Sequence, residues 1–131
     1  MKLTHERITT ENAPAALGPY SQGVAVTELG LVFTAGQVGL DPRTGELVPG
    51  GTEAETRRLL DNLEAVLTVA GSGLHRVVRA TFYLVDLADF AAVNKIYAER
   101  IGGTLPARST IQVSALPKGA RIEVDLVATR G

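Results

Sequence analysis

The longest regular pattern in the chain runs from Thr52 to Ala70, and it predicts an amphipathic helix. Thr52 and Glu55 have the spacing of a capping box, which predicts that the helix begins there. Gly71 is expected in the left-handed conformation just beyond its end. Such a helix has to bury its apolar face against another layer of structure. The apolar residues that recur along this face are Leu59, Leu60, Leu63, Val66, Leu67 and Ala70.

Six β-rich segments and a second helical pattern surround this helix. The β-rich segments are 3–9, 22–29, 31–37, 77–85, 108–113 and 121–128. The second helix is expected from Asp86 or Asp89 to about Ile101. Turn residues predict two hairpins, one closed at Gly30 and one joining 108–113 to 121–128. The order of these elements predicts an α+β fold, in which two helices cover one face of a six-stranded mixed sheet.

Alternation along the strands assigns their side chains to two faces of the sheet. The residues expected beneath the helices are Val78, Ala80, Phe82 and Leu84 in one strand and Ile122, Val124, Leu126 and Ala128 in another. Arg108, Thr110 and Glu123 are then expected on the face away from the helices. In the second predicted hairpin, Thr110 lies opposite Glu123.

Arg108 and Glu123 are the residues that most directly indicate chemistry. A guanidinium presents a fixed fork of donors that fits a carboxylate, and a carboxylate beside it can orient or deprotonate a water. Together they predict a pocket for a small carboxylic acid and a hydrolytic step. The alternative is a solvated sheet face on which an exposed ion pair contributes about 0–1 kcal/mol.

The composition narrows the class of protein. A length of 131 residues predicts one domain, 1–131. A net charge of −1 provides no overall field that would attract nucleic acid. The lack of cysteine excludes disulfides, thiolate nucleophiles and Cys-ligated zinc, and no metal site is expected. The charged segment Met1–Arg7 and the lack of a long apolar run predict a soluble, cytoplasmic protein without a membrane partner.

Seven short segments stand in a specific order between Ile8 and Thr129. They are Ala13–Gly23, Thr34–Gln37, Asp41–Glu46, Asp61–Leu63, Phe90–Asn94, Pro106–Ser109 and Arg121–Glu123. Together they resemble the RidA/YjgF family, the reactive-intermediate deaminases. The resemblance implies a chorismate-mutase-like two-layer subunit that assembles as a homotrimer. It also implies that three small-molecule sites lie between the subunits.

The resemblance implies an activity as well. Members of this family hydrolyse enamine and imine carboxylic acids, such as 2-aminoacrylate and 2-aminocrotonate, to 2-oxo acids and ammonia without a cofactor. By the match of motifs, Arg108 corresponds to the arginine that binds the substrate carboxylate and Glu123 to the acid that positions water. Tyr20 corresponds to a tyrosine of the pocket, and Asn94 to an asparagine that supports the site.

Two positions depart from the family pattern. Ala35 stands where a serine is often found, which removes a hydrogen bond to substrate. Thr110 stands where a cysteine is often found, at a position that contributes mainly through its backbone. Gly36 either permits close approach to a ligand or marks a bulge. The expected substrate-binding residues are Tyr20, Ala35, Gly36, Asn94, Arg108 and Thr110, with Arg108 and Glu123 catalytic.

Two other functions compete with deamination. The same pocket in a trimer is suited to bind 2-oxo acids without turnover, as a regulatory protein does. An endoribonuclease or translation inhibitor is a further alternative, because that activity is attributed to some relatives. The sequence has no pair of neighbouring histidines and no stripe of basic and aromatic residues that would favour binding of RNA.

Overall fold

The computed structural model describes all 131 residues and contains two α-helices and six strands, with four short 3-10 turns. The strands are β1 (His5–Ile8), β2 (Gly23–Val26), β3 (Leu31–Thr34), β4 (Val77–Leu84), β5 (Ala107–Gln112) and β6 (Ile122–Thr129). The helices are α1 (Gly51–Val69) and α2 (Phe90–Arg100). Each predicted segment therefore contains the expected kind of element, which confirms the α+β class.

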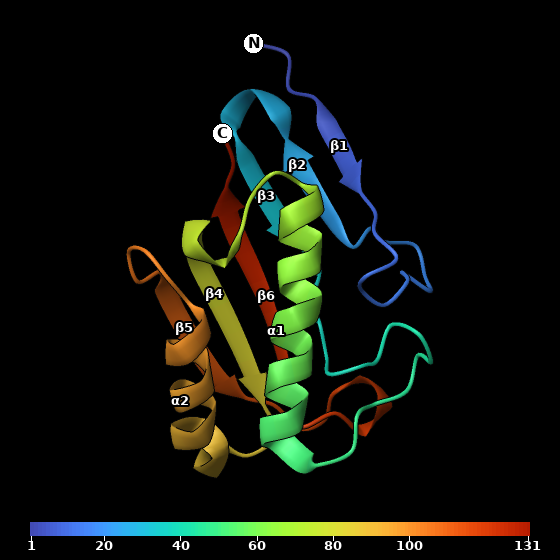
Figure 1. Cartoon of the computed structure of the whole chain (residues 1–131), viewed down its shortest axis with the longest axis vertical. Coiled ribbons are helices and arrows are strands. Elements are labelled where there is room, and N and C mark those ends of the chain that lie inside the picture. The colour runs from blue at the N-terminus through green and yellow to red at the C-terminus, as the bar shows by residue number, and fades with distance from the viewer.

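The six strands form one mixed sheet in the order β1-β2-β3-β6-β4-β5 (Figure 1). Neighbouring strands are antiparallel except β4 and β5, which are parallel. The hairpin of β2 and β3 is confirmed, and Gly30 lies between them in the left-handed region at φ 61°. The predicted hairpin of β5 and β6 is wrong, because β4 lies between these strands.

The actual pairing follows from the position of α2 in the chain. A helix between two neighbouring strands returns the chain to the starting edge, so β5 runs parallel to β4. The chain then crosses the end of β4 to reach β6. There the N–H of Val113 donates to the carbonyl of Leu84, and the N–H of Val85 donates to the carbonyl of Arg121. The proline and glycine that predicted a hairpin loop instead form a 3-10 turn, Pro117–Gly119, in this crossing.

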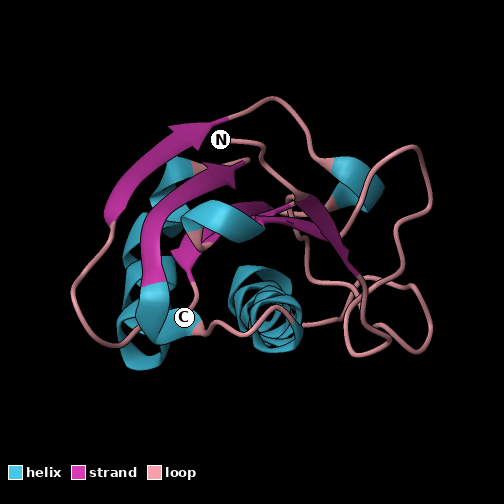
Figure 2. Ribbon diagram, turned by 90° about the horizontal axis from the view of Figure 1, so that it is seen from above, coloured by secondary structure: helices cyan, strands magenta, loops and turns pink.

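Both helices pack on one face of the curved sheet, and Figure 2 shows α1 end-on beside it. The predicted apolar face of α1 is buried against the sheet, where each aliphatic side chain contributes about 1.5–3 kcal/mol. Val78 is an exception to the predicted pattern of β4. It is 45% exposed, because the strand is irregular between Val77 and Arg79 and Val77 is buried instead. Neither helix is long and apolar enough to span a bilayer.

The predicted capping box does not cap α1. The helix begins at Gly51 and has no side-chain cap. The hydroxyl of Thr52 donates to Asp89 at 2.8 Å, and the carboxylate of Glu55 accepts the backbone N–H of Arg121 at 2.8 Å. These two residues therefore tie the start of α1 to the start of α2 and of β6.

Candidate active site

The predicted site residues fall into two groups on opposite faces of the sheet. Arg108 and Thr110 of β5 pair with Ala80 and Phe82 of β4, which are buried beneath the helices. Paired residues of neighbouring strands point to the same face, so Arg108 and Thr110 lie on the helix face. Glu123 alternates with buried residues of β6 and points to the other face. The prediction that these three residues share the face away from the helices is therefore wrong.

The error has its cause in β5, where alternation misassigned the inward residues. With Arg108 and Thr110 pointing away from the helices, Ile111 between them would face the core, but it pairs with Tyr83 on the face away from the helices and is 46% exposed. β5 is an edge strand. Beside it, the Arg108 side chain and aromatic rings fill the space that an aliphatic core residue would fill elsewhere. The pattern of apolar and polar residues along the strand does not show that an arginine takes the place of an aliphatic core residue.

The Arg108 guanidinium lies in an aromatic box formed by β4 and α2. Its Cζ atom is 4.0 Å from the ring centroid of Phe82 and 5.1 Å from the centroids of Phe90 and Tyr97. Aromatic faces attract a cation and fix the plane of a guanidinium that stacks on them. The box therefore holds the charge of Arg108 in a defined place.

Two polar side chains bind the same guanidinium and leave one of its nitrogens unused. Nη1 donates to Asn94 Oδ1 at 2.5 Å, and Nε donates to Thr110 Oγ1 at 3.1 Å. Nη2 is buried and has no partner. Arg108 forms no ion pair, and burial lowers the pKa of its guanidinium. A cation with an unused donor and no counter-ion is suited to bind an anion such as a carboxylate.

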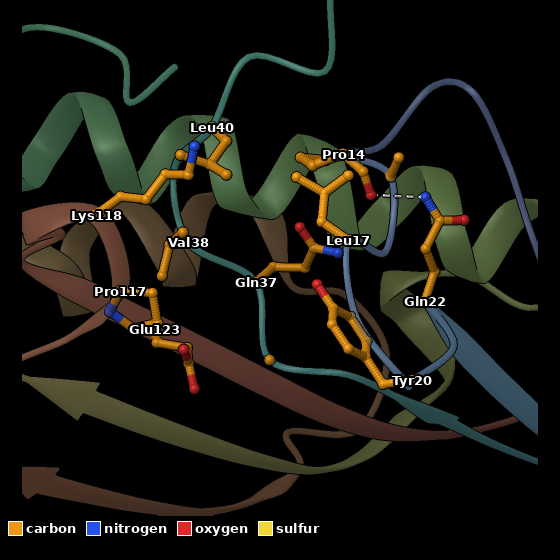
Figure 3. Close-up of a pocket in the computed structure, with 12 residues that line it drawn as sticks. Pro14, Leu17, Tyr20, Gln22, Gln37, Val38, Leu40, Pro117, Lys118 and Glu123 are labelled. Carbon is orange, nitrogen blue, oxygen red and sulfur yellow. Dashed lines mark hydrogen bonds between the residues drawn. The ribbon is translucent and has the colours of Figure 1, made fainter. Parts of the chain in front are cut away.

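Glu123 lines a separate pocket between β6 and the loop that carries Tyr20 (Figure 3). The cavity has a volume of about 200 Å³. Its other polar residues include Gln37 and Lys118, and in Figure 3 the side chains of Tyr20 and Gln37 point toward one another. Its apolar wall consists of Pro14, Ala15, Leu17, Val38, Leu40 and Pro117. The pocket thus presents one carboxylate to a small, largely apolar space.

The Glu123 carboxylate has no cationic partner in the chain. Burial raises the pKa of Glu123, and the charge of Asp125 raises it further. A carboxyl group with a raised pKa exchanges protons more readily near neutral pH than an ordinary glutamate does. No group of three or more His, Asp or Glu side chains is arranged to hold a metal ion.

The raised pKa of Glu123 predicts the pH range in which activity is lost on acidification. If Glu123 accepts a proton from water it must be ionised, so kcat/KM should fall with decreasing pH through a pKa above about 4.3, the ordinary glutamate value. Asp125→Asn removes a neighbouring negative charge and should move this acid limb to lower pH. The measurement is kcat/KM against pH for the wild type and for Asp125→Asn. Any titration of the substrate affects both profiles equally, so it does not contribute to the difference between them. An unmoved limb would contradict the role of Glu123 as the titrating base.

Gly36 allows the Glu123 side chain to lie directly against the backbone. A Cβ atom at position 36 would stand 2.5 Å from Glu123 Oε2 and 2.7 Å from its Cδ. A methyl group there has to displace the carboxylate. Because the atoms in the way belong to a flexible side chain, the fold itself should tolerate the methyl group.

Gly36→Ala should therefore lower kcat by about 10- to 100-fold, the effect of a small misplacement of a reacting group. The melting temperature should change little. Gly102→Ala is the matched control, because its Cβ would meet His75 at an ordinary 3.5 Å. Normal turnover in Gly36→Ala would show that the position of the Glu123 carboxylate has no influence on the rate.

Gln22 fixes the loop that carries Tyr20, a role that was not predicted from the sequence. Its side-chain amide donates to the carbonyls of Thr10, Ala13 and Pro14, and its oxygen accepts the N–H of Thr10. The residue is 4% exposed. One buried side-chain amide thus forms the backbone hydrogen bonds that hold this irregular segment in place. Its presence in the motif Ala13–Gly23 was the only signal for it in the sequence.

Asn62 fixes the opposite wall of the same pocket. It lies on the apolar face of α1, fully buried, and donates to the carbonyls of Val38 and Leu40. The N–H of Gln37, just before this wall, donates to the carbonyl of Val124 at 2.9 Å. A polar residue on an apolar helical stripe was a signal that the sequence did contain. No prediction was made from it for Asn62, and no local pattern shows which loop the amide holds.

Ala35 lies between β3 and Gly36 on the same segment. Its N–H donates to the carbonyl of Gln22 at 2.9 Å. Its methyl group adds no hydrogen-bonding atom, so a ligand at this position meets backbone groups only.

Comparison with known proteins gives the family of this chain. A family model described as Endoribonuclease L-PSP matches residues 10–130. The 2-iminobutanoate/2-iminopropanoate deaminase of Mus musculus is 48% identical, over 95% of this chain and 90% of its own length. The chain belongs to the RidA/YjgF family.

Solved structures of Rid proteins have the same fold as this family member. A Rid-family protein of unknown function, YyfA from Yersinia pestis, superimposes with a TM-score of 0.91 at 41% identity, covering 96% of this chain and 99% of its own. TdcF of E. coli, solved with bound serine, superimposes with a TM-score of 0.88 at 37% identity, with the same coverage. The two-layer architecture of this Rid protein is therefore that of its relatives.

Proposed function

We propose that this protein hydrolyses 2-imino acids, with 2-iminobutanoate and 2-iminopropanoate as substrates and 2-oxo acids and ammonia as products. The imines are tautomers of the enamines 2-aminocrotonate and 2-aminoacrylate. The chain acts as one domain, 1–131, in a cytoplasmic homotrimer without a cofactor. The curated relatives that are named as deaminases of these imines support the substrate class.

The observation that carries this proposal is the division of the site. Arg108 is an unpaired cation on the helix face, and Glu123 is an unpaired carboxylate on the opposite face. Within one chain the sheet separates them, so they cannot act on one small molecule. A symmetric ring of protomers places one face of a chain against a different face of its neighbour. The proposed site therefore takes Glu123 from one protomer and Arg108 from the next.

Arg108 binds and orients the substrate in this site. Its guanidinium donates hydrogen bonds to the substrate carboxylate and thereby fixes the adjacent imine carbon. The aromatic box and Asn94 keep the guanidinium in place before substrate arrives, so little orientation is lost on binding. The serine held by TdcF has a carboxylate next to a carbon that bears nitrogen, as the proposed substrates do.

Glu123 carries the protons of the reaction. It removes a proton from water as the water oxygen bonds to the imine carbon, which gives a tetrahedral carbinolamine. It then returns the proton to nitrogen, and the carbon–nitrogen bond breaks. The hydroxyl gives its proton to Glu123, which passes it to solvent, and the 2-oxo acid is formed. One water is consumed and one ammonia is released. The protein supplies position and proton transfer, because a protonated imine is already electrophilic.

A coupled assay tests the proposal. A serine/threonine dehydratase generates the imine, and semicarbazide traps whatever remains unhydrolysed. The protein should lower the amount of trapped intermediate and speed release of the 2-oxo acid. Unchanged trapping, together with measurable binding of 2-oxobutanoate, would instead identify a protein that binds 2-oxo acids without turnover.

A ribonuclease is the second candidate, because the description of the matching family model names one. The named deaminases among the relatives and the two unpaired charges favour imine hydrolysis. If the purified wild type cleaves RNA, and if Glu123→Gln retains this cleavage, the result would support a ribonuclease instead of an imine hydrolase.

A further inference from the structure

Tyr97 is the second residue in the chain with an unused buried donor. Only two buried side-chain polar atoms lack a hydrogen-bond partner, and they are Arg108 Nη2 and Tyr97 Oη. Buried polar groups are almost always paired, and leaving one unpaired costs about 1–3 kcal/mol. The two residues that carry these donors pack on the same ring, that of Phe82, which indicates a common function for the donors.

The two residues belong to one cluster. The Tyr97 ring packs edge-on against Phe82 at 4.9 Å between centroids, and Arg108 Cζ lies 4.0 Å over the face of the same ring. Arg108 Cζ is also 5.1 Å from the centroid of Tyr97. Tyr97 is 7% exposed, and burial raises its pKa although the charge of Arg108 opposes this. The phenol therefore keeps its proton at neutral pH and acts as a donor.

Both residues line one cavity, which lies between α2 and the segment leading into β5. Its volume is about 300 Å³. The remaining wall is mostly apolar and consists of Ala98, Ile101, Leu105 and Pro106, with Asn94 beside Arg108. A space of this kind suits a small anion that carries an alkyl group, with the anion at the donors and the alkyl group at the wall.

The partners of Arg108 indicate why a second donor is needed. A carboxylate has two oxygens and is best held by two donors. Nε of Arg108 is bound to Thr110 and Nη1 to Asn94, which leaves Nη2 as the only nitrogen of the guanidinium without a partner. The hydroxyl of Tyr97 is the only other unused buried side-chain donor in the chain.

We infer that Tyr97 is a substrate-binding residue, whose hydroxyl donates to the carboxylate of the 2-imino acid while Nη2 of Arg108 donates to the same group. The inference rests on the proposed function for its substrate. It adds a binding residue from α2 that the sequence motifs did not indicate. It also gives the cavity beside α2 a role in holding the substrate.

Tyr97→Phe tests the inference, because it removes the hydroxyl and keeps the ring that packs on Phe82. KM for the imine and Kd for the product 2-oxobutanoate should both rise by about 10-fold, the effect of losing one hydrogen bond to a charged group, while kcat stays within about twofold. Thr56→Val is the matched control. It removes an equally buried hydroxyl, which donates to the carbonyl of Thr52 in α1, and should leave both constants unchanged.

Two results would overturn the inference. One is unchanged KM and Kd in Tyr97→Phe. The other is a lowered melting temperature with unchanged Kd, which would assign the hydroxyl a structural role. The binding measurement does not depend on turnover. A wild type that binds 2-oxobutanoate but hydrolyses no imine would refute the proposed function, and the change in Kd would still test Tyr97.

Discussion

Replacing Arg108 with alanine should lower kcat/KM for 2-iminobutanoate by about 30- to 1000-fold, which corresponds to about 2–4 kcal/mol of transition-state stabilisation. The physical reason is that the guanidinium binds the substrate carboxylate and also holds the imine carbon next to the water that attacks it. Arg108→Lys keeps the charge but loses the planar fork, so it should recover only part of the activity. The measurement is steady-state kinetics with imine supplied by a dehydratase.

The fold should survive this change. Arg108 forms no ion pair and leaves Nη2 unpaired, so its removal breaks no buried charge pair. Arg57→Ala is the control, because Arg57 lies on the outer surface of α1 and pairs only with Glu99 at 3.6 Å. Near-normal turnover by an intact Arg108→Ala oligomer would show that another group binds the carboxylate.

Replacing Glu123 with glutamine should lower kcat by about 100- to 10,000-fold, the range for loss of a general base. Glutamine has the same shape but cannot accept the proton of water. The affinity for 2-oxobutanoate should be unchanged, because Arg108 holds the carboxylate. The measurements are kcat and the Kd of the product by calorimetry.

Stability separates this effect from misfolding. Burial and Asp125 raise the pKa of Glu123, so the folded state disfavours its charge above that pKa. Glu123→Gln removes the charge and should leave the melting temperature at pH 8 equal or higher. Glu64→Gln is the control, because Glu64 lies on the outer face of α1 near Arg100 at 3.8 Å. Equal turnover in Glu123→Gln would reject Glu123 as the base.

Local sequence patterns were sufficient to predict the elements of this fold but not all of their neighbours. The apolar stripe of α1 and the alternation of β6 each follow from a single segment, and both were predicted correctly. The pairing of β5 with β4 depends on the path of the chain after α2, which no local pattern contains. The turn residues of Pro117–Gly119 are compatible with either connection.

The candidate site shows the same limit. Arg108 and Glu123 were identified by residue type and motif, but only the face of Glu123 was predicted correctly. Predicting the face of Arg108 required knowing that aromatic rings from β4 and α2 replace aliphatic packing at the sheet edge. The buried amide of Gln22 and the hydroxyl of Tyr97 acquire meaning only from tertiary contacts. Such contacts join residues that are far apart in the chain.

We expect each catalytic centre to combine Glu123 of one protomer with Arg108 of another. Mixing Arg108→Ala with Glu123→Gln by co-refolding tests it directly, because each variant retains the residue that the other lacks. In a randomly mixed trimer, about a quarter of the sites should contain both intact residues, so about a quarter of wild-type activity should return. Mixed oligomers that remain as inactive as either variant alone would contradict the claim.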